Sequence, residues 1–235
     1  RERTHRNRYR PSRSHSSGFA KQKKVYFHTD AVQAVGNVAI NVKQLGVDLL
    51  SMSAHKFYGP KGVGALYVKE GVNFEKIQDG GDQEKDKRAG TENVAGIVGM
   101  GKAIELAHTN LQEYAKRMSK IRDYYLDEVS KKITGVKVNG DPDHRLPGNA
   151  NVSFEGLEGE AILYELDKKG ICASAGSACS TGLPEPSHVL TSIGLPSNLA
   201  NGTIRITFGE DNTKEDVDFL VQALVEIVER LRRGH

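Results

Sequence analysis

The sequence has few of the residues that stabilise secreted or membrane-spanning proteins. Among its 235 residues there is no tryptophan, and Cys172 and Cys179 are its only cysteines. Two thiols are too few for a disulfide framework or for an all-cysteine zinc or iron–sulfur site. No apolar run reaches the ~18 residues of a transmembrane helix, and the opening RERTHRNRYR lacks the apolar core of a secretory signal peptide. We therefore expect a cytoplasmic protein with no membrane contact and no metal site of its own.

Basic residues are concentrated at one end of the chain. Residues 1–24 carry nine Lys or Arg and one Glu, whereas residues 25–235 carry 24 basic and 29 acidic side chains. Because non-specific nucleic-acid binding needs clustered Lys and Arg, we expect no nucleic-acid partner except through the basic arm, residues 1–20. The arm has no apolar periodicity, so it is predicted to be disordered or foreign to the fold. An import presequence, which is also rich in Arg and Ser, is the alternative.

The rest of the chain alternates predicted strands and helices. Short apolar runs with the composition of buried parallel strands occupy residues 25–28, 47–53 and 64–68. From Ile97 to Tyr125 an apolar residue recurs every seven positions, which predicts one long helix over residues 91–133. A helix of that length exceeds the width of a small domain, so we expect it to connect two domains.

A smaller α+β pattern follows that helix. Strands are predicted at residues 136–138, 151–154 and 203–208. Helices are predicted at residues 159–169 and from Thr213, where a capping box with Asp216 begins the last helix. We therefore predict an α/β protein in three parts: the basic arm at 1–20, a large domain at 21–110, and a small α+β domain at 111–235 that includes the long linking helix.

A lysine follows the second predicted strand, in the run SMSAHKFYGPKG. Burial disfavours the ammonium form of a lysine, so a desolvated Lys56 could act as an amine nucleophile toward a carbonyl. Ser53 and His55 lie where the strand ends, the edge at which open α/β sheets bind ligands, and could hold a phosphate. An ordinary surface lysine in a Gly/Pro turn explains Lys56 equally well.

A carboxylate follows the first predicted strand, in the run HTDAVQ. Pyridoxal phosphate (PLP) needs a carboxylate at its ring nitrogen, and Asp30 could supply it, with Gln33 one helical turn on as a donor to the ring oxygen. The alternative is that Asp30 caps a helix. The occurrence of Asp30 and Lys56 at two strand ends favours the functional interpretation.

Two further segments contain reactive side chains. Cys179 lies among small residues, which predicts an accessible loop, and a reactive role would explain an exposed thiol. Cys172 ends an apolar run and is predicted to be buried and inert. Arg205, inside the alternating strand TIRITF, presents a planar fork that suits a carboxylate. The alternatives are an incidental surface cysteine and a solvent-facing arginine.

Five segments in this order resemble the PLP-dependent cysteine desulfurases of the nitrogen-fixation and iron–sulfur-assembly type. They are HTDAVQAVG, SMSAHKFYGPKGVGALYV, RAGTENVAGIVGMGKA, SAGSACSTG and TIRITFG. The resemblance covers about residues 21–233. It implies the class V aminotransferase fold, which is PLP-dependent transferase fold type I, with a mixed or parallel sheet in a partial large domain and a small C-terminal α+β domain.

The resemblance also implies a role for each matching residue of the first domain. Lys56 is similar to the lysine that binds PLP covalently. Asp30 matches the partner of the ring nitrogen and Gln33 the donor to the ring oxygen. Ser53 and His55 match ligands of the phosphate.

Three more residues acquire implied roles. Thr91 matches the threonine that reaches the phosphate of the other subunit in a homodimer. Arg205 matches the clamp for the carboxylate of L-cysteine. Cys179 matches the nucleophile that takes the substrate sulfur as a persulfide, leaves L-alanine, and passes the sulfur to an iron–sulfur scaffold or a sulfur-carrier protein.

Family members carry a comparable length upstream of HTDAVQAVG, which residues 1–20 do not match. The resemblance therefore implies that the chain is a C-terminal fragment, and we expect it to bind PLP weakly on its own. The alternatives are a catalytically impaired desulfurase that acts as an interaction module, and a selenocysteine lyase.

Overall fold

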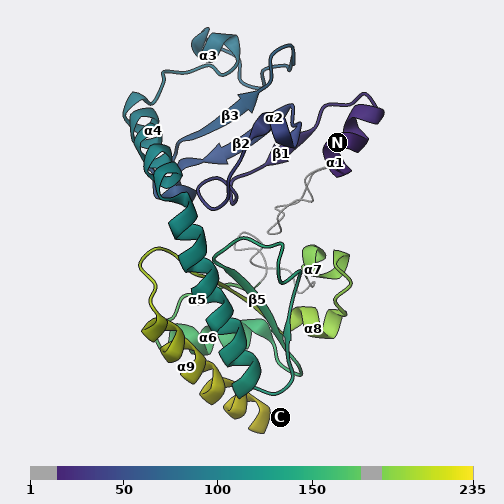
Figure 1. The fold of residues 1–235 in the computed structure, drawn as a ribbon, viewed down its shortest axis with the longest axis vertical. Helices are drawn as coiled ribbons and strands as arrows, with labels where there is room; N and C mark the ends of the chain where they lie inside the picture. The colour runs from purple at the N-terminus through teal and green to yellow at the C-terminus, as the bar shows by residue number, and fades with distance from the viewer. Residues whose placement is uncertain (1–14, 176–186, 235) are drawn as a thin grey trace. The chain divides into compact units, whose positions relative to one another are not determined.

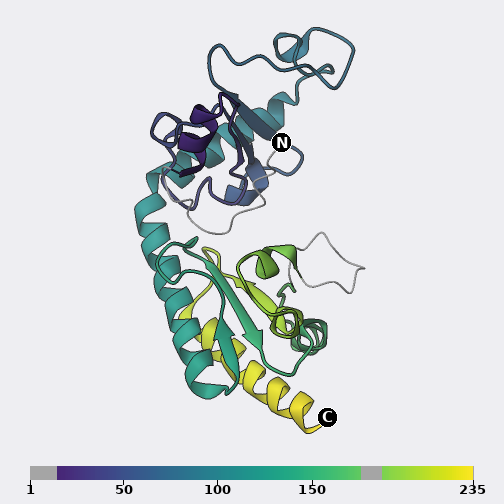
Figure 2. The same ribbon diagram turned by 90° about the vertical axis from the view of Figure 1, so that its right-hand side faces the viewer.

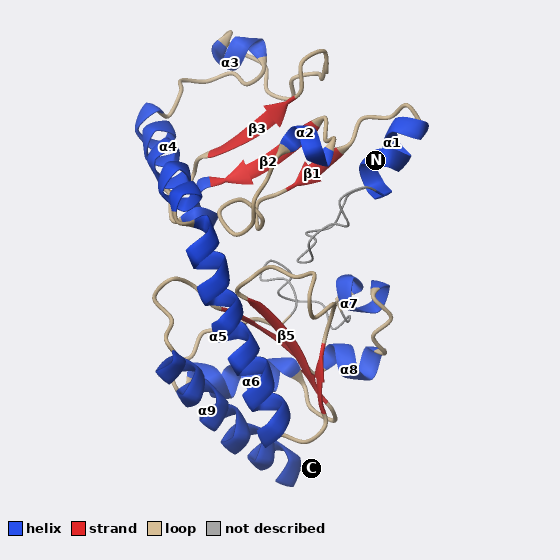
Figure 3. Cartoon of the chain, viewed as in Figure 1, coloured by secondary structure: helices blue, strands red, loops and turns tan. Residues whose placement is uncertain are grey.

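The computed structural model describes residues 15–175 and 187–234 (Figure 1). The chain divides into two compact units, residues 1–111 and 112–235. In the described residues each unit contains a three-stranded sheet, and Figure 3 shows these strands with the helices around them. Among the helices described, none is long and apolar enough to cross a membrane.

The first unit is built on a mixed sheet in the order β1-β2-β3. β1 (His28–Asp30) runs parallel to β2 (Leu49–Ser53), whereas β3 (Gly64–Val68) is antiparallel to β2. We expected three buried parallel strands, and for β3 this was wrong. The connection 54–63 is shorter than the dozen or so residues that a parallel crossover needs, so the chain turns straight back along β2.

β1 begins later than the sequence predicted. The apolar run 25–28 suggested a buried strand, but Val25 is 56% exposed and Tyr26 is 62% exposed. Strand pairing starts only at His28, opposite Leu49. The run therefore leads into the strand and forms little of it.

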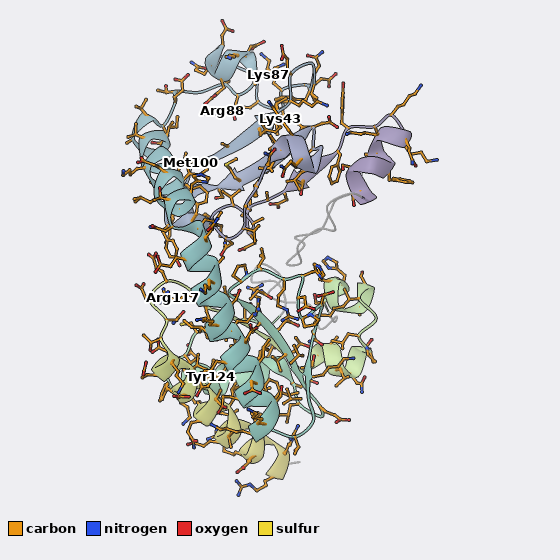
Figure 4. The ribbon with its side chains drawn as sticks, viewed as in Figure 1. Lys43, Lys87, Arg88, Met100, Arg117 and Tyr124 are labelled. Atoms are coloured by element: carbon orange, nitrogen blue, oxygen red, sulfur yellow. The ribbon has the colours of Figure 1, made fainter. Side chains whose placement is uncertain are left out.

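Several helices accompany this sheet. They are α1 (His15–Gln22), α2 (Val42–Leu45), the 3-10 helix η1 (Ala54–Phe57), α3 (Gln83–Asp86) and α4 (Val94–Thr109). Met100 of α4, labelled in Figure 4, shares a core cluster with Leu50 of β2 and with Ala54 and Phe57 of η1. This packing joins α4 to the end of β2.

α1 begins inside residues 1–20, which the sequence predicted to be disordered or foreign to the fold; residues 15–20 are ordered in this helix. Ala20 is only 6% exposed. A side chain added at Gly46, the residue that ends α2, would meet Ser17 and Lys21 of α1. Tertiary packing against the end of α2 therefore supports a helix that composition alone did not reveal.

The long helix predicted over residues 91–133 is two helices. α4 ends at Thr109 and α5 (Leu111–Lys132) follows, because Asn110 leaves helical geometry with a ψ angle of 2°. Thr109 Oγ1 donates to Glu105 O at 3.0 Å. Asn and Thr side chains bond readily to the local backbone, which weakens their preference for a helix interior.

The second unit is an antiparallel sheet in the order β4-β5-β6. Its strands are β4 (Val136–Val138), β5 (Asn149–Phe154) and β6 (Thr203–Thr207). Its helices in the described residues are α5, α6 (Gly159–Asp167), α7 (His188–Ser192), α8 (Ser197–Asn201) and α9 (Lys214–Arg233). Figure 2 shows α9, in yellow, against α5.

The two faces of this second sheet differ in chemistry. Val152 and Phe154 of β5 and Ile204 of β6 are fully buried in one cluster with Tyr125 of α5 and Leu224 of α9. Successive residues of a strand face opposite sides of the sheet. The intervening residues of β5 and β6 are polar, so the face away from this core is polar.

Polar contacts hold α5 to α9 and to the loop before it. Arg117, labelled in Figure 4, donates to Glu210 O and to Asn212 O. Tyr124 donates to Asp218 of α9. The capping box predicted at Thr213 is confirmed, with reciprocal hydrogen bonds to Asp216. The last helix is therefore fixed both at its start and along its length.

Candidate active-site residues

Asp30 and Ser53 stand at the same edge of the first sheet. β1 and β2 are parallel, with Asp30 opposite Ser51, and Ala31 N donates to Ser51 O at 2.9 Å. Because the carboxyl ends of parallel strands share an edge, the residues that follow β1 and β2 leave the sheet on the same side. Two of the segments singled out in the sequence thus come from neighbouring strands.

Lys56 is presented by η1, directly after β2. Ala54 and Phe57 are buried, whereas His55 and Lys56 are exposed. Within the described residues, no hydrogen bond or ion pair engages the side chain of His55 or Lys56. The sequence left open whether Lys56 is desolvated or exposed. In this structure η1 buries its apolar residues Ala54 and Phe57 and leaves the Lys56 side chain exposed.

Two glycines allow other segments to approach η1 closely. A Cβ at Gly36 would lie 2.5 Å from Phe57 Cβ, so the turn that follows Gln33 packs directly on η1. A Cβ at Gly59 would lie 3.1 Å from Ala103 Cβ of α4. The backbone that carries Lys56 is therefore held between that turn and α4.

Asp30 closes a turn. Its Oδ1 accepts a hydrogen bond from Val32 N at 3.0 Å, and residues 32–37 form turns, so Asp30 does not cap a helix. The side chain is exposed. Gln33, half-buried on the same turn, engages no described residue through its side-chain amide. The turn thus carries both residues that the sequence singled out after β1.

Thr91 lies just before α4, whose N-cap is Asn93. It is exposed, and its hydroxyl bonds to none of the described residues. The described part of its own unit therefore makes no use of the hydroxyl.

Arg205 lies in the second unit, on the polar side of β6. Ile204 and Ile206 face the core, so Arg205 faces away from it and is half-buried. On β5, Asn151 is directly opposite Arg205. On the other side of β6, Arg205 N donates to Ser174 O at 2.6 Å and Ser174 N donates to Arg205 O at 3.2 Å. The segment that leads toward Cys179 is therefore paired with β6 at Arg205.

A buried polar network on the same side of this sheet was not anticipated. Asn139 Nδ2 donates to Asn151 Oδ1 at 2.9 Å and to Ser153 Oγ at 2.7 Å. Ser153 Oγ lies 2.6 Å from Thr203 Oγ1, which donates to Leu199 O at 3.0 Å. The polar residues that alternate with apolar ones in NANVSF and TIRIT are the signal that could have revealed this face.

The structure tests the prediction for one of the two cysteines, Cys172. Cys172 is exposed, so the prediction that it is buried was wrong. Ile171 and Ala173 pack against the core of the second unit, and in an extended segment the residue between them points the other way. Cys179 lies outside the described residues, and its proposed role as a nucleophile remains a prediction.

Residues 15–220 match the family model for class-V aminotransferases. The chain belongs to the class-V aminotransferase family. Members of this family generally use PLP, and the segments carrying Asp30, Lys56 and Arg205 all fall within the matched range of this class-V chain.

A curated relative of this class-V chain is the cysteine desulfurase IscS of Dictyoglomus turgidum. It is 55% identical over 216 residues, which are 92% of this chain and 55% of that protein. The chain thus spans about half the length of the curated relatives it matches. The similarity confirms the resemblance to cysteine desulfurases that the sequence motifs indicated.

Solved structures confirm the fold class. A NifS-like protein from Rickettsia africae ESF-5 has a TM-score of 0.83 at 32% identity, covering 91% of this chain and 56% of that one. SspA, solved in complex with cysteine, has a TM-score of 0.63 at 31% identity, covering 82% and 52%. The NifS-like neighbours have PLP-dependent fold type I, so the predicted α/β class is confirmed.

Proposed function

We propose that this chain carries the cofactor-binding lysine and the sulfur-accepting cysteine of a cysteine desulfurase, which takes sulfur from L-cysteine and leaves L-alanine. The identity to the IscS protein of D. turgidum supports the activity, and the SspA neighbour with bound cysteine supports the substrate. The observation that carries the proposal is that Lys56 directly follows β2, beside the end of the parallel strand β1.

The groups at this edge fit pyridoxal 5′-phosphate. The cofactor has an aldehyde, a phosphate and a ring nitrogen, which call for an amine, hydrogen-bond donors and a carboxylate. Lys56 offers the amine, Ser53 and His55 offer donors, Asp30 offers the carboxylate, and Gln33 would donate to the ring oxygen. When bound, PLP supplies an electron sink for bonds to the substrate α-carbon.

The chain's own residues account for the remaining chemistry. Lys56 Nζ would move the α-proton of the substrate. Arg205 would bind the substrate carboxylate through its guanidinium fork. The thiolate of Cys179 would attack the substrate sulfur, so that the carbon–sulfur bond breaks, the sulfur stays on Cys179 as a persulfide, and protonation of the remaining carbon gives alanine.

The proposal includes partners. The persulfide would pass to an iron–sulfur scaffold or a sulfur-carrier protein in the cytoplasm. Thr91, exposed ahead of α4, would contact the cofactor phosphate of a second copy in a homodimer. The acidic balance of residues 25–235 supports the absence of a nucleic-acid partner outside the basic arm.

A second candidate function is a catalytically impaired chain that acts as an interaction module. The observation in its favour is that the chain spans about half the length of its curated relatives. A selenocysteine lyase remains the rival within enzymes, and only the desulfurase requires a persulfide on Cys179.

Reductive trapping tests the proposal. The chain is incubated with PLP, reduced with borohydride and mapped by peptide mass spectrometry; we expect a pyridoxyl adduct on Lys56. Lys56→Ala should lose the adduct, and Lys61→Ala, which removes another exposed lysine of the same loop, should retain it. An adduct spread over surface lysines, with none enriched at position 56, would contradict the assignment.

A further inference from the structure

We propose that Asn151 binds the α-carboxylate of the amino-acid substrate together with Arg205, and that Thr203 and Ser153 position its amide for this task. The proposal rests on the function proposed above, in which Arg205 receives that carboxylate. The observations behind it are the strand register, the direction of a series of buried hydrogen bonds, and a side-chain amide nitrogen that donates to none of the described residues.

The register brings Asn151 and Arg205 together. They are directly opposite each other on the antiparallel strands β5 and β6. Residues paired in this way project from the same face, with their Cβ atoms about 5 Å apart. The opposite face of both strands is filled by the core residues Val152, Ile204 and Ile206, so both side chains are on the polar face.

The backbone carbonyl of Leu199 fixes which group donates in the buried hydrogen bonds of Thr203 and Ser153. Leu199 O is a backbone carbonyl and can only accept, so the Thr203 hydroxyl donates to it, at 3.0 Å. Thr203 has no second hydrogen, so across the 2.6 Å contact Ser153 must donate to Thr203 Oγ1. The hydroxyl hydrogen of Ser153 is thereby used.

The same reasoning fixes the orientation of the Asn139 and Asn151 side-chain amides. Ser153 Oγ can only accept from Asn139, so the atom of Asn139 that lies 2.7 Å away is Nδ2. That nitrogen also contacts Asn151 at 2.9 Å, so the atom of Asn151 facing it is Oδ1. The amide orientation of Asn151 thus follows from the hydrogen-bond network.

The consequence is that Asn151 presents Nδ2 on the side away from Asn139. Within residues 15–175 and 187–234 nothing accepts a hydrogen bond from this nitrogen, and it is not among the fully buried atoms that lack partners. Asn151 as a whole is 7% exposed. Asn139 Oδ1, by contrast, is buried and accepts no hydrogen bond, which is energetically unfavourable.

An amide donor beside an arginine suits one class of ligand. A guanidinium fork binds a carboxylate through two parallel hydrogen bonds, and each carboxylate oxygen can still accept another. Asn151 Nδ2 supplies such a donor without adding charge. The pair would therefore recognise the α-carboxylate of an amino acid.

Ligand binding by the intact chain tests the contact. L-alanine, which has the carboxylate and no sulfur, is titrated while the side-chain amide NMR signal of Asn151 and the dissociation constant are followed. Loss of a hydrogen bond to a charged group predicts that Asn151→Ala weakens binding by about 10-fold or more. The matched control is Asn149→Ala, two residues along the same face of β5 and opposite Thr207, which should bind normally. Ethylamine, which lacks the carboxylate, should leave the Asn151 signal unmoved.

A second pair of variants tests the positioning role. Thr203→Val keeps the shape of the side chain but removes the hydroxyl that accepts from Ser153. The hydrogen-bond network then no longer fixes the orientation of the Asn139 and Asn151 side-chain amides. The carboxylate affinity should fall although Thr203 does not touch the ligand. Thr203→Ser, which restores the hydroxyl, should restore the affinity, and both variants should remain folded by circular dichroism.

The outcomes separate this inference from the function on which it rests. Binding that is lost in Arg205→Ala but unchanged in folded Asn151→Ala would overturn the role of Asn151 and leave that of Arg205 intact. Binding unaffected by Arg205→Ala, or no binding of L-alanine by the unmodified chain, would overturn both. Equal affinities of Thr203→Val and Thr203→Ser would overturn the positioning role.

Discussion

Phe57 occupies the space into which a side chain at Gly36 would project, with Phe57 Cβ 2.5 Å from the position of that missing Cβ. Gly36 also has a φ angle of +79°, a conformation that side chains with a Cβ rarely adopt. The contact joins the turn that carries Asp30 and Gln33 to the 3-10 helix that carries Lys56. One glycine thus holds two of the candidate cofactor segments against each other.

Gly36→Ala should therefore destabilise the first unit. The change adds both the strain of a positive φ and an overlap with Phe57, and overpacking of this kind costs about 1–3 kcal/mol. Gly62→Ala is the matched control, because Gly62 has the same φ of +79° with nothing within 4 Å. Urea denaturation should show a larger loss of unfolding free energy for Gly36→Ala. Equal losses would mean that the turn moves away from Phe57 at no cost.

The apolar runs predicted where most strands lie, because the strand residues that face a core are apolar whichever strand they pair with. β3 and β4 occupy the predicted residues, and β5 and β6 overlap them closely. The antiparallel direction of β3 and the break at Asn110 depend on connection length and on local hydrogen bonds, which an apolar pattern does not record.

The candidate site was predictable to a similar extent. Residues next to strand ends, such as Asp30 and Lys56, could be singled out because local sequence marks the strands. The pairing of Asn151 with Arg205 could not, since it depends on the register between segments far apart in the chain. The exposure of Cys172 was also missed, because it follows from the alternation of Ile171 and Ala173 on the core.

Stability should fall at acid pH partly through Asp48. Partial burial raises the pKa of this carboxyl, but the hydrogen bond from Phe27 N and the ion pair with Lys69 outweigh burial, so its pKa lies below the ordinary value of 3.8. A depressed folded pKa gives stability that is present above the unfolded pKa and is lost as pH falls through the folded pKa.

Asp48→Asn should accordingly lower stability at pH 7 and flatten its decline below about pH 4. Urea midpoints measured from neutral to acid pH would reveal the change. The control is Asp79→Asn, an exposed aspartate that bonds none of the described residues, which should leave the midpoint at pH 7 unchanged. If stability declined as steeply with falling pH in Asp48→Asn as in the unmodified chain, the contacts of the Asp48 carboxylate with Phe27 N and Lys69 would contribute nothing to stability.

The start of α9 should be sensitive to a small change. Asp216 N donates to Thr213 Oγ1 at 3.3 Å, and Thr213 N donates to Asp216 Oδ2 at 3.0 Å. Thr213→Ala removes the cap and should reduce unfolding free energy by about 1 kcal/mol. Thr213→Ser keeps the oxygen and should stay close to the unmodified chain. A loss of equal size in both variants would assign the effect to the threonine methyl group.

The two cysteines provide an internal comparison for the proposed sulfur transfer. Cys179 is the predicted nucleophile, whereas Cys172 is exposed on the extended segment that pairs with β6. After incubation with PLP and L-cysteine, peptide mapping should find one added sulfur atom on the peptide with Cys179 and none on the peptide with Cys172.

Cys179→Ala should abolish the added sulfur and its transfer to a thiol acceptor while reductive trapping at Lys56 persists. Cys172→Ala should retain both, because exposure alone does not make a thiol a sulfur acceptor. Sulfur found equally on both cysteines would mean that free sulfide or polysulfide modifies exposed thiols at random, and the persulfide mechanism would then lose its support.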